Sequence, residues 1–102
     1  MYRASDQFEH AEWLDDLEAA ADTLDLSGET RSHAGDLFLS NVPDNDRSKP
    51  AMLGACLYAG ALLAGEQPTQ SEVADAVGVS RLAVQQRWKP LVESVGLDAP
   101  DW

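Results

Sequence analysis

Basic and amide side chains near the C-terminal end of the sequence form a pattern suited to contact with nucleic acid. Arg81, Arg87 and Lys89 lie between Asp75 and Glu93, a stretch that holds no acidic residue. Arginine and glutamine side chains can donate hydrogen bonds to the edges of guanine and adenine. In a short chain this distribution is compatible with chance. Otherwise it indicates a locally basic face on an acidic body, where an anionic partner would dock.

Two helices are predicted to position these side chains, in a helix-turn-helix over about residues 69–95. Thr69 and Glu72 have the spacing of a capping box, so the first helix begins there. Gly78 suits a tight turn, and Ser80 can cap the second helix. The polar side chains expected to point outward from the second helix are Arg81, Gln85, Gln86 and Lys89. Helical hairpins with a glycine turn also occur in proteins that never touch DNA, so this pattern alone leaves DNA binding open.

The apolar side of the second helix is predicted to face the core. Its members are Val84, Trp88, Leu91, Val92 and Val95. Pro90 lies within the same helix and has no backbone N–H to donate. We therefore expect a kink or a helix end near Lys89.

Three further helices are predicted before this motif. The first begins at Ser5, includes Phe8 on an apolar stripe, and is followed by a helix that Ser27 caps. Ser48 is expected to cap the third, with Pro50 tolerated in its first turn. The third helix is apolar on every side over residues 51–64, which predicts a buried element at the centre of the bundle. It falls short of the roughly 20 residues that a membrane-spanning helix needs.

These elements predict an all-α fold of five helices in a single domain, residues 1–102. The net charge is −11, and twelve of the eighteen acidic residues precede Arg47. Such a chain is not a simple basic protein that coats nucleic acid. The acidity suits either a basic protein partner or a cytoplasm of molar salt, as in halophiles, and only two lysines among the seven basic residues favour the second explanation.

Candidate catalytic and metal-binding residues do not form a site by their spacing. His10 and His33 belong to different helices with no cysteine nearby, and Asp44 and Asp46 lack the other ligands of a calcium loop. Cys56 lies within the apolar helix and is expected to be a core residue rather than a nucleophile. We therefore expect no enzyme activity, no cofactor and no metal. The first ten residues have no apolar run, so a cytoplasmic protein is expected.

Two segments of the sequence resemble one cyclin repeat of archaeal transcription factor B, the relative of eukaryotic TFIIB. The run GEQPTQSEVADAVGVSRLAVQQRWKPL at 65–91 is similar to the end of that repeat, and the run RSKPAMLGACLYAGALLAG at 47–65 is similar to its third helix. Residues 13–41 are compatible with the first two helices. The likeness is to the second of the family's two repeats.

The resemblance implies a five-helix cyclin-like bundle whose C-terminal helix-turn-helix reads double-stranded promoter DNA beside the TATA box. It implies TATA-binding protein and RNA polymerase as partners. By position in the motif, Leu82 and Gln85 would face bases. Residues near them for base or phosphate contacts are Ser80, Arg81, Gln86 and Lys89.

Several features depart from the family. The sequence holds one repeat where the family has two, and it has no N-terminal zinc ribbon. Gln85 stands where the family tends to carry arginine, and Pro90 is foreign to that helix. We therefore expect a regulator that competes with or assists the full factor, and a homodimer would place two recognition helices on one duplex.

A protein-interaction module of cyclin-like fold is the alternative. The acidic first helix could face a basic partner from the transcription machinery without any contact to DNA. Trp13 on the flank of that helix is either the edge of the core or an anchor for such a partner. Substitutions at Arg81, Gln85 and Lys89 would abolish activity on DNA, whereas charge reversal on the first helix would abolish binding of a protein.

Overall fold

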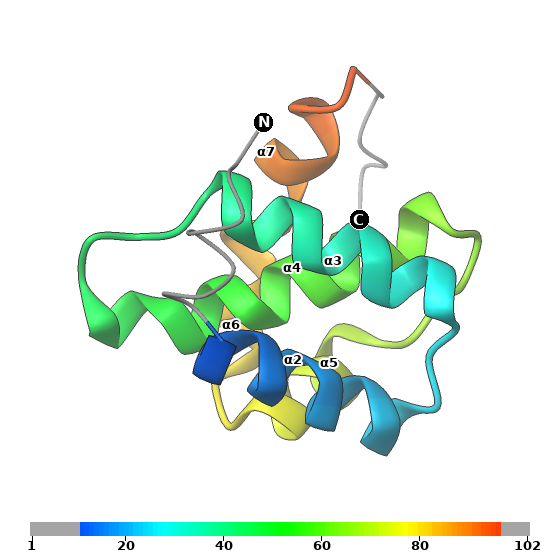
Figure 1. The fold of residues 1–102 in the computed structure, drawn as a ribbon, viewed down its shortest axis with the longest axis horizontal. Helices are drawn as coiled ribbons and strands as arrows, with labels where there is room; N and C mark the ends of the chain where they lie inside the picture. Colours follow the sequence, from blue (N-terminus) through cyan, green and yellow to red (C-terminus); the bar gives the residue numbers. More distant parts are fainter. Residues whose placement is uncertain (1–10, 97–102) are drawn as a thin grey trace.

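The computed structural model describes residues 11–96, except for the side chain of Asp46, and is all-α over that range (Figure 1). The helices are α2 (Ala11–Leu24), α3 (Gly28–Ser40), the short 3-10 helix η1 (Asp46–Ser48), α4 (Lys49–Leu63), α5 (Gln70–Val77), α6 (Arg81–Gln85) and α7 (Trp88–Glu93). The five expected helical segments are present, with the fifth divided into α6 and α7. The all-α prediction is confirmed, while the helix start at Ser5 and the burial of Phe8 lie outside the described residues.

Helix α4 occupies the centre of the bundle, as its apolar sequence predicts. It contacts each of the other α-helices of the described part, and its residues from Leu53 to Ala61 are buried (Figure 1). Small residues allow its neighbours to approach closely: a Cβ atom at Gly60 would lie 2.9 Å from the backbone nitrogen of Ala34 in α3. Glycine is therefore needed where the backbones of α3 and α4 meet.

Helices α2 and α3 are joined by a short turn and by one arginine. Ser27 caps α3 as expected, since its hydroxyl accepts a hydrogen bond from the backbone N–H of Thr30 at 3.2 Å. Arg31 of α3 reaches back to α2, with Nη1 lying 3.1 Å from Glu18 and 2.5 Å from Asp22. These hydrogen bonds, first the one to Asp22, raise the pKa of Arg31.

The start of α4 differs from the prediction. Ser48 precedes the helix but its side chain makes no capping hydrogen bond. A capping serine needs an extended backbone, whereas Ser48 has φ −87° and ψ −14° at the end of η1. The short 3-10 helix therefore introduces α4 in place of a side-chain cap, and Pro50 lies in the first turn as expected.

The last predicted helix is divided earlier than Pro90 suggests. α6 ends at Gln85, and α7 begins at Trp88 after Arg87, whose φ of −117° is far from the usual helical value of about −63°. A continuous helix would place the Pro90 ring against the carbonyl group of Gln86. The break at Gln86 and Arg87 removes that clash, because Pro90 then lies in the first turn of α7, where no N–H is needed.

The core side of this segment is largely as predicted. Trp88 is fully buried and packs edge-to-face on Tyr58 of α4, with ring centroids 5.1 Å apart. Val84, Leu91 and Val92 are also buried. The expected burial of Val95 is wrong, because α7 ends at Glu93 and leaves Val95 50% exposed.

Candidate nucleic-acid interface

Helix α5 is held by the capping box that its sequence predicts. The backbone N–H of Thr69 donates to Oε1 of Glu72 at 2.9 Å, and the backbone N–H of Glu72 donates to Oγ1 of Thr69 at 3.0 Å. These hydrogen bonds, first the one from the Thr69 backbone, lower the pKa of Glu72. The start of α5 is thereby fixed in position relative to the loop that leads from α4.

The turn between α5 and α6 depends on one glycine. Gly78 adopts φ +76° and ψ +34°, a left-handed conformation that side chains disfavour. Val79 N–H then donates to the carbonyl oxygen of Ala74 at 2.9 Å, which closes the end of α5. Ser80 follows in extended geometry, and its Oγ accepts a hydrogen bond from the N–H of Ala83 at 3.2 Å. The predicted turn at Gly78 and the predicted helix cap at Ser80 are therefore both confirmed.

The two helices pack onto α4 through another glycine. Val84 of α6 is fully buried, and Val77 of α5 packs partly buried against the same core. A Cβ atom at Gly54 of α4 would lie 3.0 Å from Cγ2 of each of these two valines. Gly54 therefore provides the space in which the α5–α6 pair sits on the central helix.

The predicted contact residues differ in how far they face solvent. Ser80, Arg81 and Gln86 are exposed, and Leu82 is 58% exposed. Gln85 is half-buried, so the expectation that it points fully outward is only partly met. Lys89 is also half-buried, with Nζ 5.6 Å from the centre of the Trp88 ring. The structure therefore places five of the predicted residues on α6 and at the positions directly before and after it, and Lys89 lies on α7.

Basic side chains on α6 and α7 and acidic side chains on α2 lie in different regions of the fold. Helices α6 and α7, up to Val92, carry basic residues and no acidic one. Helix α2 exposes the carboxylates of Glu12, Asp15, Asp16, Glu18 and Asp22. An anionic ligand would therefore be attracted to α6 and α7 and repelled by α2.

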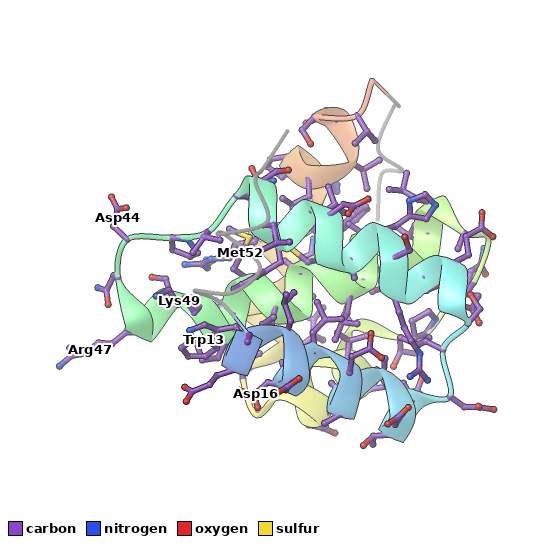
Figure 2. All side chains as sticks on the ribbon, viewed as in Figure 1. Trp13, Asp16, Asp44, Arg47, Lys49 and Met52 are labelled. Atoms are coloured by element: carbon purple, nitrogen blue, oxygen red, sulfur yellow. The ribbon has the colours of Figure 1, made fainter. Side chains whose placement is uncertain are left out.

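Trp13 marks the edge of the core at the start of α2. It is half-buried against the core, and the ring centre lies 5.5 Å from Nζ of Lys49 at the start of α4. Figure 2 shows Trp13, Lys49 and Asp16 close together where these two helices meet. These contacts support the interpretation of Trp13 as a core-edge residue.

One residue that sequence reasoning missed connects the two helices of the pair. Gln70, the first residue of α5, is only 9% exposed, and its Oε1 accepts from Nη1 of Arg81 at 3.3 Å. Both side chains line a hollow with Tyr58, Leu62 and Ser71. A glutamine at a helix start gives no sign in the sequence that it will be buried, so only the tertiary structure identifies it.

Two other side chains that were candidates for catalysis or metal binding, Cys56 and His33, lie within helices of the bundle. Cys56 is buried in α4, and this burial raises the pKa of its thiol. His33 lies 3.8 Å from Glu29 on the same helix. Within residues 11–96, no group of three or more histidine, cysteine, aspartate or glutamate side chains is placed to hold a metal ion. No helix in that range is long and apolar enough to cross a membrane.

Comparison with known proteins identifies a family for this fold. Residues 10–94 match the family model of the transcription factor TFIIB repeat. The chain is 33% identical over 82 residues to transcription initiation factor IIB 2 of Thermococcus kodakarensis, an alignment that covers 78% of this chain and 27% of that protein. It is 35% identical over 83 residues to transcription initiation factor IIB of Pyrococcus abyssi, covering 78% of this chain and 28% of that protein.

A third relative matches over most of both chains. It is transcription initiation factor IIB of Haloarcula vallismortis, 30% identical over 80 residues, which are 76% of this chain and 70% of that sequence. By contrast, the chain spans little more than a quarter of the Thermococcus and Pyrococcus proteins. With its all-α fold and a family match over nearly its whole length, this chain belongs to the family of transcription factor TFIIB repeats.

Proposed function

We propose that this chain is a DNA-binding transcription factor or regulator that uses α6 as its recognition helix. The observation that carries the proposal is the exposure of Arg81, Leu82 and Gln86 on a helix, and the turn after it, that carry no acidic residue and that a glycine turn connects to α5. In a helix-turn-helix the second helix lies in the major groove with its N-terminal residues against base edges, while the first crosses the backbone. Helix α5 would then be the first helix of the motif, which crosses the DNA backbone.

The exposure of each side chain suggests which residues would contact bases and which would contact phosphates. Leu82 and Gln86 lie one turn apart on the outer surface and suit direct contact with bases. Gln85 is half-buried and reaches a base only at the edge of this surface. Lys89, on α7 beside Trp88, suits a phosphate. Ser80 is exposed at the turn that would approach the duplex.

The acidic body limits the conditions under which such a contact forms. A net charge of −11 repels naked DNA at low ionic strength, where screening extends over long distances. We therefore propose that binding needs one of three aids. These are concentrated salt, a second protein such as TATA-binding protein or RNA polymerase, and a second copy of this chain that places another recognition helix on the duplex.

Fluorescence anisotropy of labelled promoter DNA tests this function. The full chain is titrated in about 2 M KCl, a concentration at which the Debye length falls below about 3 Å, with and without TATA-binding protein. The variant Arg81→Ala/Gln86→Ala is expected to lose binding. The control Asn45→Ala/Arg47→Ala removes the same charge and a similar amide from the exposed segment before α4, where Figure 2 labels Arg47. This control is expected to bind as the wild type does. Absence of binding by folded wild type under both conditions, and also after RNA polymerase is added, would disprove DNA binding.

A protein-interaction module is the second candidate, favoured by the acidic surface of α2. Arg31 forms salt bridges with Glu18 and Asp22. The carboxylates in the first half of the helix, by contrast, are exposed to solvent: Glu12, Asp15 and Asp16. A basic partner protein from the transcription machinery would suit that surface. Asp15→Lys/Asp16→Lys should abolish such binding and leave DNA binding intact or improved, whereas Arg81→Ala/Gln86→Ala should do the reverse.

A further inference from the structure

Gln70 and Arg81 connect the first residue of α5 to the first residue of α6 across the turn of the motif. The distance between Gln70 Oε1 and Arg81 Nη1 is 3.3 Å, and eleven positions separate the two residues in sequence. Arg81 is exposed, whereas Gln70 is 9% exposed. The side-chain oxygen of the buried Gln70 thus accepts a hydrogen bond from the guanidinium group of the exposed Arg81.

Burial of the Gln70 amide restricts where Arg81 can lie. A buried polar group needs a hydrogen-bond partner, and Arg81 supplies one for the Gln70 oxygen. A guanidinium group has five N–H donors in a fixed plane. With one donor directed at Gln70, the others remain available to an acceptor on the solvent side.

The direction of the bond separates Arg81 from the exposed face of α6. Side chains in a helix lean toward its N-terminus, and Arg81 at the start of α6 reaches back to the start of α5. Thr69 and Ser71 line the hollow at this place. Leu82 and Gln86, in contrast, stay on the outer surface of α6.

We propose that Gln70 is a positioning residue that holds Arg81 against a backbone phosphate of the bound duplex, so that Arg81 sets the register of α6 and reads no base. This inference rests on the proposed function. In a helix-turn-helix the first helix crosses the DNA backbone, so an arginine fixed at the junction of the two helices would meet a phosphate of the strand that α5 crosses. Phosphate contacts of this kind orient a recognition helix without carrying sequence information. The base contacts then fall to Leu82, Gln85 and Gln86.

A double-mutant cycle on the full chain tests the proposal. The variants are Gln70→Leu, Arg81→Gln and the two combined, each checked for folding by its thermal unfolding curve. The probes are two labelled duplexes, the promoter and the same length with changed bases, titrated over a series of KCl concentrations at which the wild type binds both. Should Gln70→Leu unfold the chain, Gln70→Met removes the same acceptor with an unbranched side chain.

Arg81→Gln is expected to weaken binding roughly tenfold, by the same factor for both duplexes. It should also reduce the slope of log affinity against log salt by about 0.9, the value for one phosphate contact. Gln70→Leu should weaken wild-type binding roughly threefold. It should have no further effect once Arg81 is glutamine, a result that a merely structural role of Gln70 would not give.

Four results would overturn the proposal. If the two substitutions weaken binding additively, Gln70 does not act through Arg81. If Arg81→Gln changes the preference between the duplexes, or leaves the salt slope unchanged, Arg81 reads a base or makes no contact. A wild type that binds neither duplex at any KCl concentration, alone or with TATA-binding protein and RNA polymerase, would reject the proposed function itself, and this inference with it.

Discussion

The carboxylate of Glu66, just beyond α4, caps the beginning of α3 from 39 positions further along the chain. Its Oε1 accepts a hydrogen bond from the backbone N–H of Ser27 at 3.0 Å and lies 2.9 Å from the Ser27 hydroxyl. The hydroxyl of Thr30 also donates to it. Gly65 makes this possible with φ +82°, which turns the chain back toward α3. A negative charge at this place is stabilised by the unpaired N–H groups of the helix start.

Removal of this carboxylate should destabilise the fold. Glu66→Ala leaves the Ser27 N–H and the buried Thr30 hydroxyl without this acceptor. We expect the melting temperature to fall by a few degrees in a calorimetric or circular dichroism scan. Glu93→Ala, at an exposed position at the end of α7, is the matched control and should leave the melting temperature nearly unchanged. An equal effect of both substitutions would show that the Glu66 contacts do not stabilise α3.

Acid should weaken the same contacts. The pKa of Glu66 is lowered, first by the hydrogen bond from Thr30 and then by those from Ser27. A carboxyl group whose pKa is lower in the folded state contributes its full stability above its ordinary value, about 4.5, and loses it as the pH falls through the lowered value. The contribution of Glu66 to the free energy of unfolding should therefore fall in this acidic range.

Urea unfolding at a series of pH values measures this effect. Acid also relieves repulsion among the many other carboxylates, so the informative quantity is the difference in the free energy of unfolding between wild type and Glu66→Gln. That difference should be largest above about pH 4.5 and should shrink below it. A difference that stays constant with pH would show that the charge of Glu66 has no part in the cap.

Two glycines on the facing helices α3 and α4 should respond in opposite ways to alanine. At Gly60 a Cβ atom would meet the backbone of α3, 2.9 Å from the nitrogen of Ala34 and 3.0 Å from the carbonyl oxygen of Thr30. Gly60→Ala should therefore lower the free energy of unfolding by about 1–3 kcal/mol. Gly35→Ala has no atom within 4 Å of its new Cβ and should raise it by about 0.5–1 kcal/mol, since alanine favours a helix. Urea unfolding would check both, and tolerance of Gly60→Ala would contradict the close approach.

Local signals account for most of the fold that the sequence predicts. The capping box at Thr69 and Glu72, the left-handed Gly78 and the apolar run of α4 are confirmed because each depends on neighbouring residues or on a single helix. Ser48 fails as a cap because η1 rotates its backbone out of extended geometry. Its residue type is favourable, but a short 3-10 helix is not apparent from composition.

Contacts between distant residues explain what the sequence cannot predict about the site. Gln70 and Glu66 are both polar residues near helix ends, and either would ordinarily be assigned to solvent. Their roles arise from partners 11 and 39 positions away, which only the packed bundle brings near. The same holds for Gln85, which the helical pattern places outside but which is half-buried.

Leu82 offers a test of base recognition that does not depend on charge. It is 58% exposed at the start of α6, and Val95 is comparably exposed, at 50%, beyond α7. Leu82→Ala and Val95→Ala should each change the free energy of unfolding by less than about 0.5 kcal/mol, because neither side chain is in the core. An apolar side chain in the major groove can pack on the methyl group of thymine.

Promoter duplexes with deoxyuridine in place of single thymines remove that methyl group and nothing else. For one position, wild type should bind the deoxyuridine duplex roughly fourfold more weakly, the effect of one buried methyl group. Leu82→Ala should bind the two duplexes alike, whereas Val95→Ala should keep the wild-type preference. If Leu82→Ala retains the preference at every position, Leu82 does not contact a thymine, and the recognition surface of α6 would be confined to its polar side chains.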